Sequence, residues 1–250
     1  MDKKEMIYGT RAVIEAIRAG RDIETILIQQ GLRNDLVHEL IDLARKSGLP
    51  FNYVPEQKLA GLSSKNHQGV IALLSSIHFE SVENIVHAVF SDGREPFVLI
   101  LDRVTDVRNF GAIVRTAETA GIQAIVIPEK GSAPISADAM KTSAGALNFV
   151  PVCRSKNLKQ TMRELKNSGL KIVACTERAS EIIFNTDLTG PLALIFGSEE
   201  DGVLPELLKE ADCLAKIPMV GKIHSLNVSV AAGIALYEAV RQKGFSQSKQ

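Results

Sequence analysis

Four short, almost wholly apolar segments recur from residue 97 onward, each separated from the next by a stretch with helical periodicity. They span residues 97–101, 124–127, 171–174 and 192–196. Strands of this kind are buried on both faces, which is typical of a parallel sheet covered by helices on each side. The sequence therefore predicts an α/β fold, with a ligand site at the carboxyl ends of the strands, where Asp102 and Gly197 follow.

The first part of the chain predicts a smaller α/β layer. Helical periodicity covers residues 10–19 and 34–46, and strand-like segments cover residues 24–28, 51–54 and 70–74. A polar stretch follows, with strong turn chemistry at residues 91–96 and a segment at 82–90 that is compatible with a short helix. We expect one domain over residues 1–76, a linker over 77–95 and a second domain over 96–250.

Composition places the chain among ordinary soluble proteins. Hydrophobic residues make up 45% of its 250 residues and charged residues 23%. No window approaches the length of apolar sequence that a membrane span needs, and the N-terminus lacks a signal-peptide core, so we expect a cytoplasmic protein without a membrane partner. The three cysteines are widely spaced, which indicates neither a disulfide framework nor a zinc site.

The charge balance limits how the chain could hold nucleic acid. It has 29 basic and 29 acidic residues, and thus a formal net charge of zero. Bulk electrostatic attraction to nucleic acid is therefore weak. An RNA enzyme with this balance would need basic residues placed locally at its site.

Three strand-to-loop junctions in the last third of the chain are dense in Gly, Pro and small polar residues. They begin at Gly197, Ile217 and Ser225. Such loops present backbone N–H and C=O groups to a ligand. The acidic run that begins at Glu199 argues against a phosphate ligand. The glycine patterns of nucleoside triphosphate and dinucleotide sites are absent from the sequence, which also disfavours a Rossmann-type methyltransferase.

A helix is expected over residues 109–120, with Asn109 near its N-cap. Gly111, Arg115 and Glu118 fall on one stripe of this helix, and a glycine one turn before the arginine predicts open space beside the guanidinium. The alternative interpretation is an exposed Arg115–Glu118 ion pair on a solvated face. Ser225 is expected to cap a C-terminal helix over residues 228–241, and His224 beside it to face solvent.

Together, the segments at residues 109–121, 192–199 and 217–229 resemble the three motifs of the SpoU (TrmH-like) branch of the SPOUT RNA 2′-O-methyltransferases. They are most similar to the RlmB-type members, which methylate a guanosine ribose in 23S ribosomal RNA. The resemblance implies a ribosomal-protein-like substrate-binding domain followed by a SPOUT domain with a deep trefoil knot. It also implies a homodimer, S-adenosylmethionine as methyl donor, no metal, and RNA rather than DNA as substrate.

The resemblance also implies residue roles. The catalytic residues would be Arg115, Asn109, Glu199, Ser225 and Asn227, with Glu118 supporting Arg115, and the methyl donor would contact the backbone of Gly197, Ile217 and Leu226. Ser198 and Asp201 depart from the family pattern. A guanidinium is a poor proton acceptor, so the sequence leaves open whether Arg115 activates the ribose hydroxyl or only orients it.

In the first domain, four side chains are candidate RNA contacts: Arg11, Arg18, Lys65 and His67. Glu15 lies between the two arginines, so a self-neutralised surface stripe explains them equally well. Two other functions remain open for the whole chain. One is a transfer-RNA ribose methyltransferase of the same fold, and the other is a catalytically silent RNA-binding or ribosome-assembly protein.

Overall fold

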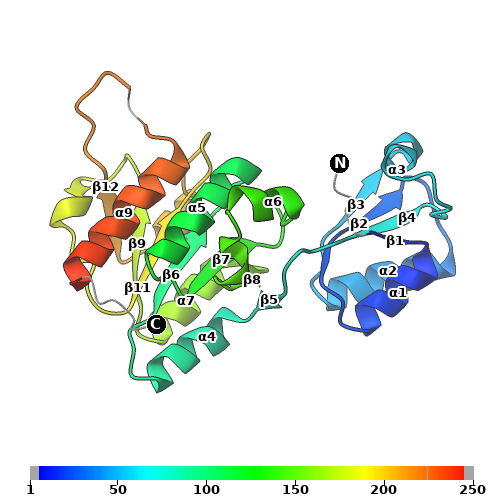
Figure 1. Cartoon of the computed structure of the whole chain (residues 1–250), viewed down its shortest axis with the longest axis horizontal. Coiled ribbons are helices and arrows are strands. Elements are labelled where there is room, and N and C mark those ends of the chain that lie inside the picture. The colour runs from blue at the N-terminus through cyan, green and yellow to red at the C-terminus, as the bar shows by residue number, and fades with distance from the viewer. Residues whose placement is uncertain (1–5, 224, 245–250) are drawn as a thin grey trace. The chain divides into compact units, whose positions relative to one another are not determined.

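The computed structural model describes residues 6–223 and 225–244. The chain divides into two compact units, and the main part of the first ends at His78 while the second begins at Phe79. Each unit is a β-sheet with helices packed on it (Figure 1). No helix in the described ranges combines the length and the apolar character needed to cross a membrane.

The first unit has a four-stranded sheet in the order β1-β4-β2-β3. β2 is parallel to β3 and antiparallel to β4, and β1 is antiparallel to β4 at the edge. Helices α1 and α2 cover one face, and α3 covers the other. The bounds are β1 (Met6–Tyr8), α1 (Thr10–Arg18), β2 (Ile23–Gln29), α2 (Asp35–Lys46), β3 (Phe51–Val54), α3 (Glu56–Leu62) and β4 (Val70–Leu74).

The second unit has an eight-stranded sheet in the order β10-β12-β9-β11-β6-β7-β8-β5, in which every neighbouring pair is parallel. This confirms the parallel sheet predicted from the apolar segments. The strands are β5 (Phe79–Glu80), β6 (Phe97–Leu101), β7 (Ala124–Pro128), β8 (Val152–Ser155), β9 (Lys171–Cys175), β10 (Glu181–Ile182), β11 (Leu192–Phe196) and β12 (Cys213–Lys216).

Helices cover both faces of this sheet. Alternate residues such as Val98 and Ile195 pack on one face against α4 and α7, whereas α5 and α9 lie side by side on the other (Figure 1). Ala232 and Ala235 of α9 are fully buried, and their small side chains permit close packing of this helix. The helices are α4 (Val82–Ser91), α5 (Val107–Thr119), α6 (Ala137–Thr142), α7 (Leu158–Asn167), α8 (Pro205–Leu208) and α9 (Val228–Lys243), with short 3₁₀ turns at Ala146–Asn148 and Ile183–Asn185.

The segment expected to be a linker differs in the structure. β5 pairs with β8 at the edge of the large sheet, and the compatible helix at residues 82–90 is present as α4. Val82 and Val86 of α4 are buried in the core of the second unit. The apolar positions of α4 alternate with polar ones and lie next to strong turn residues. For this reason the sequence did not indicate that one face of this helix is buried in the second unit.

The sequence predicts that Gly111 leaves open space beside the Arg115 guanidinium, but Thr142 fills the space at Gly111. A Cβ atom built at Gly111 would lie 2.1 Å from Oγ1 of Thr142, the last residue of α6. The Thr142 hydroxyl donates to the carbonyl of Val107, at 3.2 Å. Gly111 is therefore the position at which α5 and α6 make close contact.

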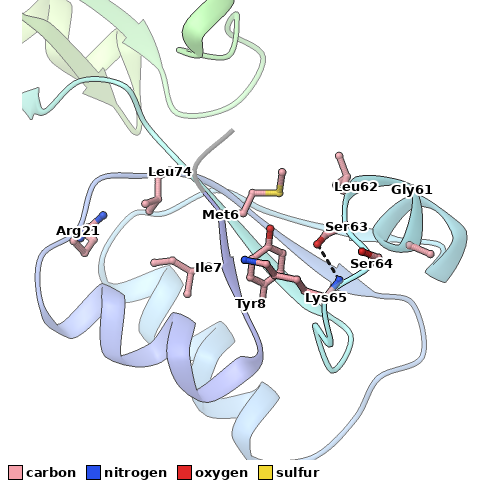
Figure 2. A pocket seen from close by; sticks show the side chains of 11 residues that line it. Met6, Ile7, Tyr8, Arg21, Gly61, Leu62, Ser63, Ser64, Lys65 and Leu74 are labelled. Carbon is pink, nitrogen blue, oxygen red and sulfur yellow. Dashed lines mark hydrogen bonds between the residues drawn. The ribbon is translucent and has the colours of Figure 1, made fainter. Parts of the chain in front are cut away.

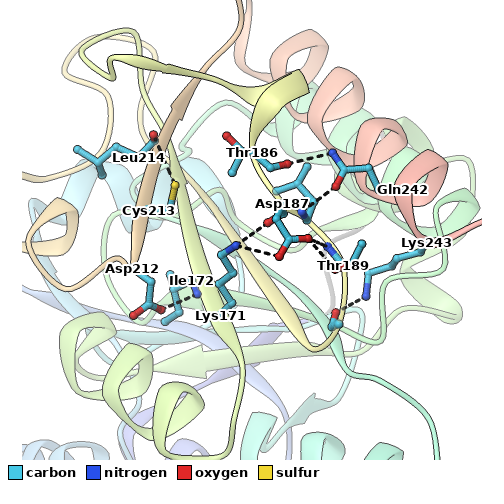
Figure 3. A network of polar contacts seen from close by, with 12 residues as sticks. Lys171, Ile172, Thr186, Asp187, Thr189, Asp212, Cys213, Leu214, Gln242 and Lys243 are labelled. Carbon is cyan, nitrogen blue, oxygen red and sulfur yellow. Dashed lines mark hydrogen bonds and ion pairs between the residues drawn. The ribbon is translucent and has the colours of Figure 1, made fainter.

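The C-terminal end of α9 is held by the loop that precedes β11 (Figure 3). Gln242 accepts from the backbone N–H of Leu188, at 2.8 Å, and donates to the carbonyl of Thr186, at 3.0 Å. Lys171 of β9 donates to the carbonyl of Asp187 in the same loop, at 2.7 Å. The loop thus joins the last helix to the middle of the sheet.

Replacing Gly111 by alanine should destabilise the second unit, because Thr142 cannot move away without losing its backbone hydrogen bonds. Overpacking of this kind costs about 1–3 kcal/mol, which lowers the thermal midpoint by several degrees in a chain of this size. The matched control is Gly233→Ala in α9, where the new Cβ would lie 3.7 Å from Thr116. Calorimetry that gave the two variants equal midpoints would contradict the close contact.

Candidate functional site

The site lies where the strand order of the large sheet reverses. β6 and β11 are neighbours, and the sheet continues through β7 and β8 on one side and through β9 and β12 on the other. Leu101 and Phe196, the last residues of β6 and β11, are paired in register. In open parallel sheets, ligands bind outside the carboxyl ends of the strands at such a reversal. Asp102 and Gly197 follow the two strands there, as the sequence predicts.

A buried carboxylate joins the two loops that leave this edge. Asp102 is 1% exposed, and its Oδ2 accepts from the backbone N–H of Leu204, at 2.8 Å. Its Oδ1 accepts from Nε of Arg103, at 3.2 Å. The Arg103 guanidinium also pairs with Asp201 and donates to the carbonyl of Gly202, at 3.1 and 3.0 Å. The loop after β6 is therefore bonded to the loop after β11.

Arg103 is a residue that sequence reasoning missed. Its φ of 57° is in the left-handed region, which few non-glycine residues occupy. The contacts with Asp102, Asp201 and Gly202 offset the cost of this conformation. The available signal was the position of Arg103 directly after the junction residue of a buried strand.

The turn after β11 requires glycine at its first position. A Cβ atom at Gly197 would lie 1.9 Å from the carbonyl carbon of Gly202 and 2.0 Å from the nitrogen of Val203. The hydroxyl of Ser198 accepts from the backbone N–H of Asp201, at 3.1 Å. Ser198 and Asp201, which depart from the family pattern, thus have structural roles here, because one closes the turn and the other pairs with Arg103.

Three of the predicted catalytic residues form one hydrogen-bonded cluster, which we call the amide–carboxylate cluster: Asn109, Glu199 and Asn227. Asn109 donates from Nδ2 to Oε1 of Glu199. Asn227 donates from Nδ2 to Oδ1 of Asn109, at 3.0 Å, and reaches Oε1 of Glu199 at 3.5 Å. These residues come from α5, from the loop after β11 and from the residue before α9.

The orientation of the two amides in the cluster is fixed by a backbone donor. The N–H of Ser229 donates to Oδ1 of Asn227, at 2.9 Å, so the amide nitrogen of Asn227 must face Asn109. Oδ1 of Asn109 then accepts, and its amide nitrogen faces Glu199. Both amides therefore direct an N–H toward Oε1 of Glu199.

The two predicted N-caps are wrong by a few positions. Asp106, not Asn109, caps α5, because its Oδ1 accepts from the backbone N–H groups of Arg108 and Asn109, at 2.8 and 2.9 Å. Asn227, not Ser225, caps α9. The correction has a functional consequence, since Asn109 is left with a side chain that is available to the cluster.

Three other predicted residues lie outside the hydrogen bonds of this cluster. Arg115 and Glu118 are exposed on α5, and no ion pair joins them within the described ranges. The alternative of an Arg115–Glu118 pair is thus not what the structure has. Ser225 is exposed in the loop before α9. His224 lies outside the described residues.

A cavity of about 290 Å³ adjoins the cluster. All three residues expected to contact a methyl donor line it, together with Glu199 and Ser225. Cys175 also lines it, and burial raises the pKa of that thiol to about 12. The complete lining comes from residues 175–178, 196–202, 215, 217, 219, 225, 226, 228 and 231.

A second cavity, of about 300 Å³, shares residues 198–201 with the first. Its remaining lining residues come from the loop after β6, at residues 103–106, and from Gly131. The acidic turn after β11 is therefore a common wall of two cavities. One polar cluster and two adjoining cavities can accommodate two reactants side by side.

Comparison with known proteins places this arrangement in a family. The profile described as "SpoU rRNA Methylase family" matches residues 96–237, and the profile described as "RNA 2'-O ribose methyltransferase substrate binding" matches residues 6–79. The chain belongs to the SpoU rRNA methylase family. The 23S rRNA (guanosine-2'-O-)-methyltransferase RlmB of Vibrio parahaemolyticus is 37% identical over 242 residues, which cover 96% of this chain and 97% of that protein.

Solved structures of similar proteins agree with this membership. The AdoMet-bound rRNA methyltransferase from Sinorhizobium meliloti has a TM-score of 0.60 and 27% identity, covering 97% of this chain and 88% of that one. The A. aeolicus TrmH/SpoU tRNA modifying enzyme has a TM-score of 0.55 and 36% identity, over 60% of this chain and 76% of that one. The SPOUT fold expected from the sequence is confirmed, whereas its knot stays a prediction.

The four candidate RNA contacts of the first unit have different surroundings. Arg18 pairs with both Glu15 and Glu39, at 2.9 and 2.7 Å, so it belongs to a neutralised stripe. The ring of His67 accepts from the backbone N–H of Gly69, at 3.0 Å. Arg11 is exposed on α1. Lys65 lies in a pocket, with its ammonium 5.1 Å from the centre of the Tyr8 ring.

Replacing Asp102 by alanine should destabilise the fold strongly, because the N–H of Leu204 and the guanidinium of Arg103 lose a buried acceptor. We expect a loss of roughly 3 kcal/mol in the free energy of unfolding. The matched control is Asp92→Ala, which removes an exposed pair with Arg94 and should cost less than about 1 kcal/mol. Urea unfolding measures both, and similar losses would show that Asp102 does not hold the two loops together.

Proposed function

We propose that this chain transfers a methyl group from S-adenosylmethionine to the ribose 2′-hydroxyl of a guanosine in 23S ribosomal RNA. The observation that carries the proposal is the amide–carboxylate cluster beside a cavity that Gly197, Ile217 and Leu226 line. The near full-length similarity to an RlmB protein, including the substrate-binding profile, supports ribosomal RNA as the substrate. In this proposal the first unit binds RNA and the second unit performs the transfer.

The cavity beside the cluster fits a positively charged methyl donor. Its described lining includes the acidic residues Glu177, Glu199, Glu200 and Asp201, and Arg178 is the one cation among those described residues. The sulfonium and amino groups of S-adenosylmethionine are positive, and it carries no phosphate for these carboxylates to repel. When bound, the donor supplies a methyl group that a nucleophile can displace from sulfur. Because the Cys175 thiol has a raised pKa, it remains protonated at neutral pH and does not compete as a nucleophile.

The cluster residues orient the reacting ribose. The hydrogen bonds from Asn109 and Asn227 to Glu199 both end on Oε1, so Oε2 can accept from a ligand hydroxyl or ammonium. The cavity shared between the loops after β6 and β11 is a place for the nucleoside, next to the donor. Glu199 would hold the ribose hydroxyl beside the donor, which would supply the methyl group and leave as a neutral thioether when its C–S bond breaks, while the hydroxyl proton is released to water.

Arg115 is assigned the role of holding the ribose hydroxyl or the neighbouring phosphate. Its exposed position on α5, the helix that carries Asn109, suits a group that meets a macromolecular substrate. A guanidinium remains protonated at neutral pH, so orientation and charge stabilisation suit it better than proton abstraction. Glu118 and Ser225 are proposed as its supports.

Two alternatives differ in substrate or activity. The A. aeolicus tRNA modifying enzyme is similar to 60% of this chain, which keeps transfer RNA as an alternative substrate. A silent RNA-binding protein on this scaffold would have no need of the amide–carboxylate cluster. A cytoplasmic location, the exclusion of DNA and the lack of a metal remain predictions.

Arg115→Ala should lose turnover while keeping its thermal midpoint and its affinity for the methyl donor. Removal of one transition-state contact costs about 100-fold to 1,000-fold in rate. Arg115→Lys should be nearly as slow, since an ammonium lacks the planar fork of the guanidinium. The matched control is Arg108→Ala, an exposed arginine two turns earlier on α5. Single-turnover transfer of a tritiated methyl group to ribosomal and to transfer RNA measures all variants and separates the two substrates.

A rate within a few fold of the unchanged protein for Arg115→Ala would remove Arg115 from the mechanism. Absence of transfer by the unchanged protein to either RNA would favour the silent scaffold. Transfer to transfer RNA alone would favour the other enzymatic alternative.

A homodimer formed through the second unit is proposed as the functional assembly. Exposed apolar side chains gather on the loop before α9 and on α9 itself: Met219, Val220, Ile223, Leu226, Val230 and Tyr237. Apolar surface of this kind on a soluble protein indicates a partner, and closed two-fold dimers are the commonest assembly of identical chains.

Sedimentation equilibrium at micromolar concentration should therefore give twice the mass of one chain. Val230→Asp should shift the protein toward the monomer, because it places a charge on the exposed apolar surface of α9. The matched control is Leu36→Asp, a comparably exposed leucine on α2 of the first unit. A monomeric unchanged protein with full activity would contradict the proposed assembly.

A further inference from the structure

A cavity of the first unit runs beside the edge strand β1 (Figure 2). Its volume is about 780 Å³, within the range of pockets that hold a small molecule or one nucleotide. Strand β1, the end of α3 and the turn after it supply most of the lining. The lining residues are Met6, Ile7, Tyr8, Arg21, Ala60, Gly61, Leu62, Ser63, Ser64, Lys65 and Leu74.

The aromatic ring in this pocket, that of Tyr8, is held in place by the sheet and the small core on which it packs. Tyr8 is paired in register with Ile71 of β4, which is fully buried. Together with Met6 and Leu62, the Tyr8 side chain packs against the small core between the sheet and α3. It is only half-buried, so the ring combines a fixed position with an accessible surface.

Lys65 places a positive charge beside this ring. Its ammonium lies 5.1 Å from the ring centre, and Figure 2 shows its side chain reaching back toward Tyr8. The backbone N–H of Lys65 donates to the hydroxyl of Ser63, at 3.1 Å, which fixes the turn that carries the lysine. The hydroxyl of Ser64 lines the same pocket. The pocket thus combines the aromatic ring of Tyr8, the ammonium of Lys65 and serine hydroxyl groups.

The charge of the lining selects the sign of the ligand. Arg21 and Lys65 are cations, and none of the eleven described lining residues is Asp or Glu. In a chain with no net charge this is an uneven distribution, and it is opposite to the acidic cavities of the second unit. A flat, partly apolar group that carries negative charge fits these features.

We propose that this pocket binds one unpaired nucleotide of the RNA substrate, with its base against Tyr8 and its phosphate near Lys65. Unstacked bases in loops and bulges are the parts of RNA that aromatic side chains and arginine or lysine recognise. The inference rests on the proposed function only in taking the ligand to be RNA. It gives Lys65 a specific role that the other three candidate contacts of the first unit do not share.

The test is binding of the full-length chain to two labelled RNAs, followed by fluorescence anisotropy. One is a hairpin with an unpaired loop, and the other is a blunt duplex of the same stem sequence. Tyr8→Ala should bind the hairpin about 10-fold to 100-fold more weakly, the loss expected for one stacked base, and the duplex unchanged. Tyr8→Phe should retain most of the hairpin affinity, because the ring remains.

The matched control is Tyr53→Ala, which removes an exposed tyrosine from β3 at the opposite edge of the same sheet. This variant should bind the hairpin as the unchanged protein does. Lys65→Gln, a surface change, should reduce the slope of log affinity against log salt by about 0.7, as expected for one lost phosphate contact to a single strand. If circular dichroism shows that Tyr8→Ala is unstable, Lys65→Gln still tests whether the pocket binds RNA.

Equal hairpin affinities for Tyr8→Ala, Lys65→Gln and Tyr53→Ala would overturn the proposal, and would leave the pocket to a ligand other than RNA. Parallel losses for the hairpin and the duplex would overturn the unpaired-nucleotide part of it. Failure of the proposed function is distinguishable, because a chain without methyl transfer would still show the Tyr8-dependent preference for the hairpin. If the unchanged chain transfers methyl groups and Tyr8→Ala leaves the KM for RNA unchanged, the pocket proposal is overturned while the proposed function stands.

Discussion

The parallel pairing of β6 with β11 is the constraint on which the rest of the second unit depends. It brings together two strands that are far apart in the sequence and aligns their ends at Leu101 and Phe196. The pairing is extended by the N–H of Asp102, which donates to the carbonyl of Phe196, at 2.8 Å. A buried carboxylate is costly unless its oxygens are satisfied. Asp102 meets this condition only when the loop after β11 folds over it, so the strand pairing and the shape of the cavities are coupled.

The described cavities of the two units differ in the sign of their charged lining residues, which the zero net charge of the chain conceals. The cavities at the carboxyl ends of the strands are rich in carboxylates, and the charged residues in the described lining of the pocket beside β1 are Arg21 and Lys65. A cationic methyl donor and an anionic RNA would thus be attracted to different parts of the molecule. Separation of the two attractions reduces competition between a small charged ligand and a polyanion for one surface.

The sequence predicted the strands better than it predicted the contacts between helices. Near-continuous apolar runs identify buried strands locally, so β6, β9 and β11 lie where they were expected. Gly111 could not be interpreted correctly, because the atom that fills its space belongs to Thr142, on another helix. The caps failed for a different reason. Asp106 and Asn109 are both good capping residues within one turn, and only the backbone angles decide between them.

The site itself was predicted through resemblance rather than through periodicity. Nothing in the local pattern brings Asn109, Glu199 and Asn227 together, since 118 residues separate the first from the last. The resemblance named these residues, and the structure joins them in one cluster. It did not name Arg103, whose left-handed backbone and three partners are properties of the folded chain.

The separation of Asn109 from Asn227 also bears on the order in which the protein becomes competent during synthesis. The strands of the small sheet all lie within residues 6–74, so this sheet can form while the rest of the chain is still being made. The amide–carboxylate cluster needs a residue that precedes the last helix, and that helix is in turn held by the loop before β11. A nascent chain would therefore form the sheet of its first unit well before the amide–carboxylate cluster of its second unit, and the cluster cannot form in a chain that ends before Asn227.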